Sequence, residues 1–322
     1  MKKIQLKDLA DKLGISVSQV SRALNQRGSV APEIRSRVVE LARKMNYRNF
    51  SWRHTRKIAI IIERFADFDN NILNETLRIC KKLSWQIVVI PRQNIELLND
   101  QLYDGAIVIS CAEVAPGWHE KYNMPLVVIN NFGSALDRIC SVFPDADGEV
   151  RIAMEHLIAL GHTRIARIRG GAPDASEQNL QRGLGEFYRI AEACGIRDTV
   201  FNACYAGNEE KIAAVCELIA KGFTAFLVVM DDDIPSLLDA IRKCGKRIPE
   251  DISVITYESH SISAFQDPPL TTLEYDYKRL TALALQQLGN EMDNGEVASQ
   301  IVVPVRINIR SSTGPCNRCV TG

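Results

Sequence analysis

The chain has 322 residues, of which 46% are apolar, so it is long enough for two or three domains with sizeable cores. Its formal charge is zero, yet residues 1–57 hold fourteen Lys or Arg against four acids, a net of +10 that the rest must balance with −10. A basic head on an acidic body indicates a polyanion partner for the head alone.

The compartment follows from what the sequence lacks. No stretch is long enough to cross a membrane, and the N-terminus carries no apolar run typical of a signal peptide. The nine cysteines are odd in number and scattered, which is typical of reduced thiols. We therefore expect a cytoplasmic protein with no membrane partner.

Residues 1–25 predict two short helices joined by a tight turn. Apolar residues recur at helical spacing from Leu6 to Leu13, Gly14 can end that helix in a left-handed conformation, and Ser16 can cap the next one. The second helix turns a polar and basic face outward, and such a face suits the major groove of DNA. This pattern predicts a helix-turn-helix. We expect DNA contacts at Ser16, Val17, Ser18, Ser21, Arg22, Asn25, Ser29 and Arg53.

Three segments of the head carry a family resemblance. Asp8-Leu9-Ala10, Gly14-Ile15-Ser16 and Val20-Ser21-Arg22-Ala23-Leu24-Asn25 resemble the head of the lactose-repressor (LacI/GalR) family of transcriptional regulators. A third helix, opened by Pro32, completes a three-helix head over residues 1–48. The resemblance implies a regulator, in most cases a repressor, that binds an operator as a homodimer because one head reads only a half-site.

The linker, residues 49–57, departs from that family. It is short, and it lacks the Ala-Arg-x-Leu hinge pattern with which family members wedge leucines into the minor groove. Its only large apolar residues, Phe50 and Trp52, lie two apart, which no helix places on one face. We expect them to pack on the protein, with Arg53 and Arg56 contacting phosphates and with little or no central kink in the operator.

From Ile58 onward, short apolar runs alternate with helical stretches. The predicted strands are 58–62, 86–90, 106–109, 126–129, 165–168, 225–229 and 252–255, and the predicted helices of the second set are 150–160, 180–194, 209–221 and 234–243. This pattern predicts two doubly wound parallel-sheet lobes in an α/β body like that of periplasmic binding proteins, spanning 58–313. Lobe 1 takes about 58–139 and 271–300, lobe 2 about 140–270 and 301–313, and 314–322 form a disordered tail. The stretch between Ile90 and Gly105 is too short for the long helix that the family usually has there. We therefore expect a lobe 1 that is smaller than in the family.

Segments of the body also resemble the family, among them residues 155–166, 248–255, 268–273 and 310–313. The resemblance implies that Arg182, Asp231 and Glu258 contact the hydroxyls of a small effector, most simply a sugar. Asp231 and Glu258 follow the predicted strands 225–229 and 252–255 within three residues, at the end of the strands where ligands of such folds bind. Together with two aromatic residues, the expected effector set is Phe65, Arg182, Asp231, Glu258 and Tyr275.

A metal-dependent enzyme and a periplasmic binding protein are the alternatives to this function. The run Asp231–Asp233 could bind a divalent cation in a metal-dependent sugar-processing enzyme, or could simply favour the start of a helix. A periplasmic binding protein would need a signal peptide and no basic head. No catalytic motif or phosphate loop is present, and Cys316 with Cys319 supplies only two ligands. We expect no enzyme activity, no cofactor and no metal.

Overall fold

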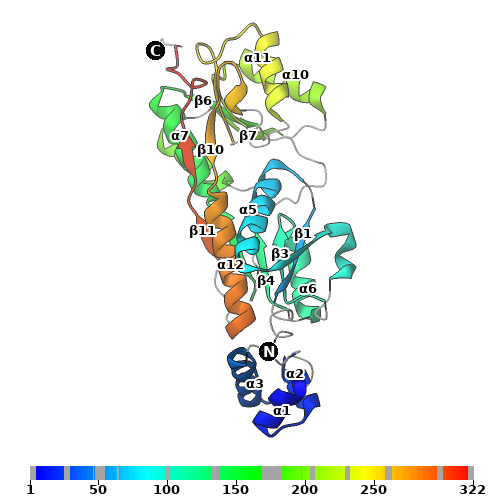
Figure 1. The fold of residues 1–322 in the computed structure, drawn as a ribbon. Helices are drawn as coiled ribbons and strands as arrows, with labels where there is room; N and C mark the ends of the chain where they lie inside the picture. The colour runs from blue at the N-terminus through cyan, green and yellow to red at the C-terminus, as the bar shows by residue number, and fades with distance from the viewer. Residues whose placement is uncertain are drawn as a thin grey trace.

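The computed structural model describes residues 5–24, 30–45, 47, 55–63, 65–98, 102–122, 124–131, 136, 138–168, 183–196, 198–203, 207–228, 233–257, 263–295 and 300–317. Figure 1 shows a small helical head at one end of the molecule, followed by two α/β lobes in a row. The predicted fold class is confirmed. No helix within these residues is both long and apolar enough to cross a membrane.

The head consists of α1 (Leu6–Leu13), α2 (Val17–Leu24) and α3 (Pro32–Lys44). Its small core joins all three helices through Leu9, Val20 and Val38, which are fully buried. Gly14 ends α1 with a φ of 64°, and its N–H donates to the carbonyl of Ala10. The predicted glycine stop is therefore confirmed, because this left-handed conformation is cheap only for glycine.

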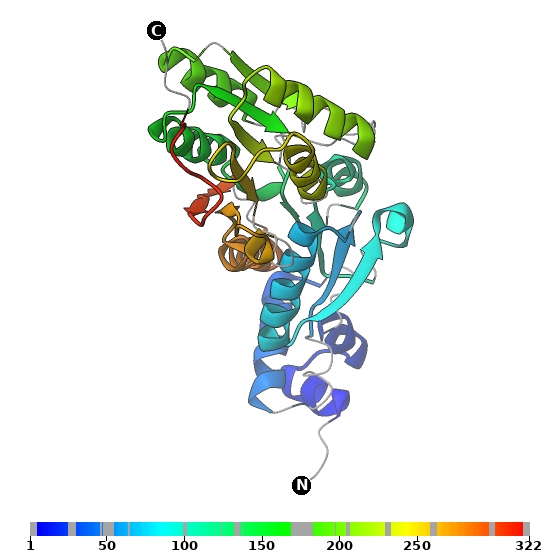
Figure 2. The same ribbon diagram turned by 90° about the horizontal axis from the view of Figure 1, so that it is seen from above.

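The sheet of lobe 1 has the strand order β11-β5-β4-β3-β1-β2, and all its pairings are parallel. Its strands are β1 (Lys57–Ile62), β2 (Gln86–Pro91), β3 (Gly105–Ile109), β4 (Leu126–Ile129), β5 (Cys140–Pro144) and β11 (Ile301–Val303). Alternate residues of β1 enter different cores. Ile58 and Ile60 pack under α5 (Asp67–Leu83) and α12 (Tyr277–Asn294), whereas Ile61 packs with Trp118 of α6 (Ala115–Tyr122). Figures 1 and 2 both show α12 beside α5.

Lobe 2 repeats this design with the strand order β12-β10-β9-β8-β6-β7. Its strands are β6 (Arg164–Ile168), β7 (Asp198–Ala203), β8 (Ala225–Val228), β9 (Ser253–Tyr257), β10 (Thr271–Glu274) and β12 (Arg306–Asn308). The edge strand β12 is antiparallel to β10, and the other pairings are parallel. One face is covered by α7 (Ala146–Ala159) and α9 (Leu184–Ala193), the other by α10 (Asn208–Ala220) and α11 (Ile234–Lys243).

The crossovers between lobes lie a few residues from the predicted positions. β5 pairs with β4 in lobe 1, although the sequence placed residue 140 onward in lobe 2. β10 pairs with β9 in lobe 2, and β11 pairs with β5 in lobe 1, which corrects the boundaries at 271 and 301 as well. In the first two cases the chain completes a strand before it changes lobe. The segment 140–144 was missed because its apolar run is broken by Ser141.

These short crossovers fix how the lobes face each other. β5 ends at Pro144 and α7 of lobe 2 begins at Ala146, while β10 ends at Glu274 and α12 of lobe 1 begins at Tyr277. Each connection leaves the carboxyl end of its strand and enters the other lobe within two residues. The carboxyl edges of the two sheets must therefore face each other, and this is the edge at which ligands of such folds bind.

Two further features bear on the predictions. Among the described residues between β2 and β3, the chain forms only the 3₁₀ turn η1 (Arg92–Leu97), in agreement with a lobe 1 smaller than in the family. Two further 3₁₀ turns are η2 (Ala112–Val114) and η4 (Ser263–Phe265). The start of the tail is not disordered, contrary to the prediction. The N–H of Cys316 donates to the carbonyl of Leu160 at 2.8 Å, and Asn317 donates to Glu250 at 3.1 Å.

Candidate DNA interface and effector site

The start of α2 is held by a reciprocal cap. The N–H of Gln19 donates to the hydroxyl of Ser16 at 3.2 Å, and the Gln19 side chain accepts from the N–H of Ser16 at 3.0 Å. Such a capping box satisfies two donors that the helix leaves unpaired, so it fixes the end of the helix that would enter a groove. The predicted cap at Ser16 is confirmed.

The outward face of α2 carries four of the predicted DNA-binding residues. Val17 is 43% exposed, Ser18 and Arg22 are exposed, and Ser21 is half-buried. The Arg22 Nε donates to the carbonyl of Ser18 at 3.3 Å, which aligns the guanidinium along the helix. An arginine on such a face can bond both acceptors of guanine, and a valine can meet a thymine methyl group. The other predicted residues, Asn25, Ser29 and Arg53, lie outside the described residues.

The end of the linker contacts the body. Arg56 forms an ion pair with Asp293 near the end of α12, and its guanidinium lies over the ring of Trp85, 5.1 Å from the centroid. Lys57 lies over Tyr103 at the same distance. Arg56 was expected to contact phosphate. Because its charge is already engaged by a carboxylate and an aromatic face, the structure favours packing of Arg56 on the body over the expected phosphate contact.

Two predicted effector residues can be placed. Phe65 follows β1 and is 62% exposed, and its carbonyl accepts a hydrogen bond from Asn70 at 2.8 Å. Tyr275 follows β10 and packs against the cores of both lobes. Its ring stacks on Tyr257 of lobe 2 at 5.6 Å and meets Phe68 of lobe 1 edge-on at 5.4 Å. Tyr275 thus lies where the two lobes meet. Arg182, Asp231 and Glu258 lie outside the described residues.

A series of hydrogen-bonded polar side chains that was not predicted from the sequence lies at the carboxyl edge of lobe 1. Ser110, directly after β3, donates to the buried Asp69 carboxylate at 2.6 Å, and Asn130, directly after β4, donates to Ser110 at 3.3 Å. Ser110 and Asn130 have φ values of 57° and 63°, a conformation that costs free energy and clusters at ligand sites. Both residues could have been found from their positions directly after strands, a criterion that was used above for acidic residues but not for Ser and Asn.

An ion-pair network lies at the same edge. Arg92, directly after β2, reaches Glu63 at 2.8 Å and Glu113 at 2.9 Å. Burial, followed by the charges of Glu113 and Glu63, raises the pKa of the neighbouring Cys111 thiol to about 12. That thiol is therefore neutral at physiological pH and suits packing rather than chemistry.

Of the three aspartates at 231–233, only Asp233 is among the described residues. Asp233 is buried at the start of α11 and forms an ion pair with the buried Lys211 of α10. Asp231 and Asp232 lie outside the described residues. Within the residues that the structure describes, no group of three or more His, Cys, Asp or Glu could hold a metal ion. For Asp233 the local observation favours a structural ion pair over a cation ligand.

Comparison with known families assigns both parts of the chain. Residues 5–49 match the bacterial regulatory proteins of the lacI family, and residues 154–313 match the periplasmic binding protein-like domain. The first match covers the head, and the second covers most of lobe 2 together with the last strands of both sheets.

Relatives of similar length are transcription regulators. The chain is 24% identical over 307 residues to the HTH-type transcriptional repressor PurR of Aliivibrio fischeri, with 88% of this chain and 90% of the relative covered. It is also 24% identical over 339 residues to the HTH-type transcriptional regulator DegA of Bacillus subtilis, with 98% and 99% covered.

Solved structures show the same fold. The lac repressor dimer bound to operator and the anti-inducer ONPF superposes with a TM-score of 0.70 at 21% identity, covering 97% of this chain and all of that one. The complex of the transcriptional regulator CelR with cellobiose gives a TM-score of 0.68 at 21% identity, with 96% and 99% covered.

A helix-turn-helix head joined to two periplasmic-binding-protein-like lobes defines a DNA-binding transcription regulator. The chain thus combines a lacI-family DNA-binding head with a periplasmic-binding-protein-like domain, as its sequence resemblance predicted.

Proposed function

We propose that this protein is a cytoplasmic, homodimeric repressor whose affinity for its operator is set by a small polyhydroxylated ligand bound between the carboxyl edges of the two lobes. The polar chain of Asp69, Ser110 and Asn130 carries this proposal, because it concentrates carboxylate, hydroxyl and amide groups at that edge. Each sugar hydroxyl both donates and accepts, and such groups match that requirement.

Within this proposal, Arg182, Asp231 and Glu258 complete the site from lobe 2, and Phe65 and Tyr275 supply apolar surface for the ring. Tyr275 contacts both lobes, so a ligand beside it would favour one closure angle over another. Since each lobe-1 linker leads to a head, a change of closure would alter the spacing of paired heads on the two half-sites. The relative CelR was solved with cellobiose, which supports a sugar as the ligand class.

On the DNA side, Ser16, Val17, Ser18, Ser21 and Arg22 would meet the major groove, with Asn25, Ser29 and Arg53 as further contacts. The proposal assigns no catalytic step to the chain. The enzyme alternative depended on the three consecutive aspartates as metal ligands, and Asp233 is engaged by Lys211.

Ligand and DNA titrations test the effector site. A thermal-shift panel of neutral sugars, including D-ribose and cellobiose, should yield at least one ligand that raises the melting temperature. Arg182→Ala and Glu258→Gln should abolish that shift and the ligand's effect on operator binding, while unliganded operator affinity stays within about twofold. Ser110→Ala should weaken ligand binding about tenfold, since a lost hydrogen bond at a polar site is worth roughly 1–2 kcal/mol. A full ligand response in the Arg182 and Glu258 variants would place the effector site elsewhere.

A further inference from the structure

The two helices that cover one face of the lobe 2 sheet begin in direct contact. Gly183, at the start of α9, has a φ of 72°, and a Cβ added there would lie 2.5 Å from Cγ2 of Val150 and 3.1 Å from the carbonyl oxygen of Ala146, both in α7. Only glycine fits such a close approach in this conformation. The start of α9 is therefore seated on the first turns of α7.

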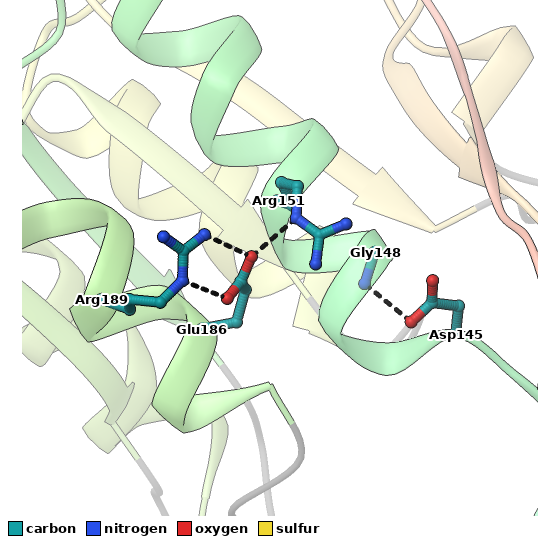
Figure 3. Close-up of polar contacts among 5 residues, drawn as sticks. All are labelled: Asp145, Gly148, Arg151, Glu186 and Arg189. Carbon is teal, nitrogen blue, oxygen red and sulfur yellow. Dashed lines mark hydrogen bonds and ion pairs between the residues drawn. The ribbon is translucent and has the colours of Figure 1, made fainter. Parts of the chain in front are cut away.

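A carboxylate links the same two helices. Glu186, in the first turn of α9, accepts a hydrogen bond from the Arg151 Nε of α7 at 2.7 Å. It also accepts two from Arg189 of its own helix, at 2.7 and 2.8 Å. Figure 3 shows Glu186 between the two guanidinium groups. Both arginines bind the same acid, but only Arg151 joins one helix to the other.

The charge state of this link is stable. The Glu186 side chain is 9% exposed, and hydrogen bonds from Arg189 and then Arg151 lower the pKa of its carboxyl group to about 2. The acid also lies near the N-terminus of α9, where the helix dipole favours a negative charge. Glu186 therefore remains ionised, and the link to Arg151 persists, throughout the physiological pH range.

The α7 end of the link is fixed at a crossover between the lobes. β5 of lobe 1 ends at Pro144, and the next residue, Asp145, caps α7 by accepting from the N–H of Gly148 at 2.9 Å. Figure 3 shows this cap on the same helix as Arg151. A chain of contacts thus runs from the end of β5 through the start of α7 to the start of α9.

The residue that precedes Gly183 is Arg182. We propose that Arg151 and Glu186 are positioning residues for the effector site: they hold the start of α9 in place and thereby set the position from which Arg182 reaches the ligand. This inference rests on the proposed role of Arg182. Neither residue needs to touch the ligand, because their contribution is to hold the start of α9, the segment that directly follows the expected effector residue Arg182.

The pair of arginines provides a matched test. Arg151→Ala and Arg189→Ala each remove one guanidinium from the same carboxylate, but only the first cuts the link between helices. Arg151→Lys keeps a cationic donor and serves as the conservative variant. The binding probe is whichever of D-ribose and cellobiose shifts the melting temperature of the unaltered protein, measured by calorimetry. Hydrogen exchange of residues 180–188 without ligand gives an independent readout.

For Arg151→Ala we expect about three- to fivefold weaker sugar binding, the factor that a partly exposed ion pair can supply, and faster exchange at residues 180–188. Arg189→Ala should change sugar binding less than twofold, Arg151→Lys should retain most of the affinity, and operator binding without sugar should be unchanged in all three. Equal effects of Arg151→Ala and Arg189→Ala on sugar binding and on exchange would overturn the inference.

Arg182→Ala separates this inference from the proposed function. If it abolishes sugar binding while Arg151→Ala leaves both binding and exchange unchanged, the positioning role fails and the effector site stands. If Arg182→Ala leaves sugar binding intact, or neither sugar binds the unaltered protein, the proposed function fails, and with it the role assigned to Arg151.

Discussion

The two lobes share one strand order but use the amino edges of their sheets differently. In lobe 1 that edge receives the linker from the head, and a carboxylic acid lies there: Glu291 of α12 accepts from the N–H of Leu126 at 3.2 Å. In lobe 2 that edge receives the C-terminal tail, and a histidine lies there: His162 contacts Thr224 at 2.8 Å and the carbonyl of Gly314 at 3.1 Å. Two sheets with the same strand order therefore have different titratable groups at the amino ends of their strands.

The two buried groups respond to pH in opposite directions. Burial raises the pKa of Glu291 to about 7, so folding of lobe 1 favours the protonated acid. Burial lowers the pKa of His162, and likewise of His156, so folding of lobe 2 favours the neutral ring. The amino edge of lobe 1 is thus weakened by rising pH and that of lobe 2 by falling pH.

The largest effect on the free energy of unfolding should come from removing the His162 side chain. The ring lies 2.9 Å from the Ser253 hydroxyl in addition to its contacts with Thr224 and Gly314, and all three partners lose a bond in His162→Ala. We expect a loss of about 2–4 kcal/mol in the free energy of unfolding, because buried polar groups are left unsatisfied. Urea unfolding measures it, and hydrogen exchange should place the loss in lobe 2. His162→Gln, which keeps one donor, should lose less; a loss spread evenly over both lobes would contradict the comparison.

Glu291→Gln should stabilise the protein in alkaline solution. Between a usual pKa near 4.5 and the folded value of about 7, the folded state binds a proton that the unfolded state does not, so stability is present below that window and is lost as pH rises through it. An uncharged amide avoids this loss and should add roughly 2 kcal/mol at pH 8 but little at pH 5. Chemical denaturation at both pH values tests the prediction, with the exposed Asp293→Asn as control. The same gain at both would show that Glu291 does not titrate as argued.

Mild acid should weaken lobe 2. Because the pKa values of His162 and His156 are lowered in the folded state, the unfolded chain takes up protons below about pH 6.5 that the folded chain excludes. Stability should therefore fall as the pH drops from 6.5 to 5.5, more through the buried His162 than through the half-buried His156. Measuring unfolding in the Glu291→Gln background removes the opposing group. If His162→Gln leaves the acid-side slope unchanged, His162 is not its source.

The smallest effect concerns the linker. Arg56 pairs with a carboxylate that is 60% exposed, so Arg56→Ala should cost only about 0.5 kcal/mol of stability. Because its charge is engaged within lobe 1, it should leave the salt dependence of operator binding unchanged. Arg53→Ala should instead reduce the slope of log affinity against log salt by about 1, as expected for one lost phosphate contact. Equal reductions in this slope for Arg56→Ala and Arg53→Ala would show that Arg56 contacts the DNA.

Much of the architecture could be predicted because the responsible signals are local. The stop at Gly14, the cap at Ser16 and the apolar run at 58–62 each involve neighbouring residues and strong preferences. The crossover positions could not be predicted. Whether β5 belongs to lobe 1 depends on its pairing with β4, and the local sequence of residues 140–144 does not indicate that pairing.

Only part of the proposed effector site could be predicted from the sequence. Tyr275 lies between the lobes, and its contact with the effector stays a prediction. Ser110 and Asn130, which the proposed site includes, were not predicted, because small polar residues after strands are common and carry little signal alone. Their arrangement becomes visible only through the hydrogen bonds from Asn130 to Ser110 and from Ser110 to Asp69, which lies forty-one residues from Ser110. The contact of the tail with His162 was also missed, since the three partners of that ring, Thr224, Ser253 and Gly314, lie far apart in the sequence.

Sequence-specific DNA binding is tested most directly by selecting duplexes from a random DNA pool and measuring binding of the selected duplexes by fluorescence anisotropy. The account predicts an enriched palindrome, about ten- to hundredfold weaker binding of that palindrome by Arg22→Ala with little change on random DNA, and an affinity that responds to a sugar from the panel. A pool without enrichment, or an equal loss on selected and random duplexes, would contradict sequence reading by α2.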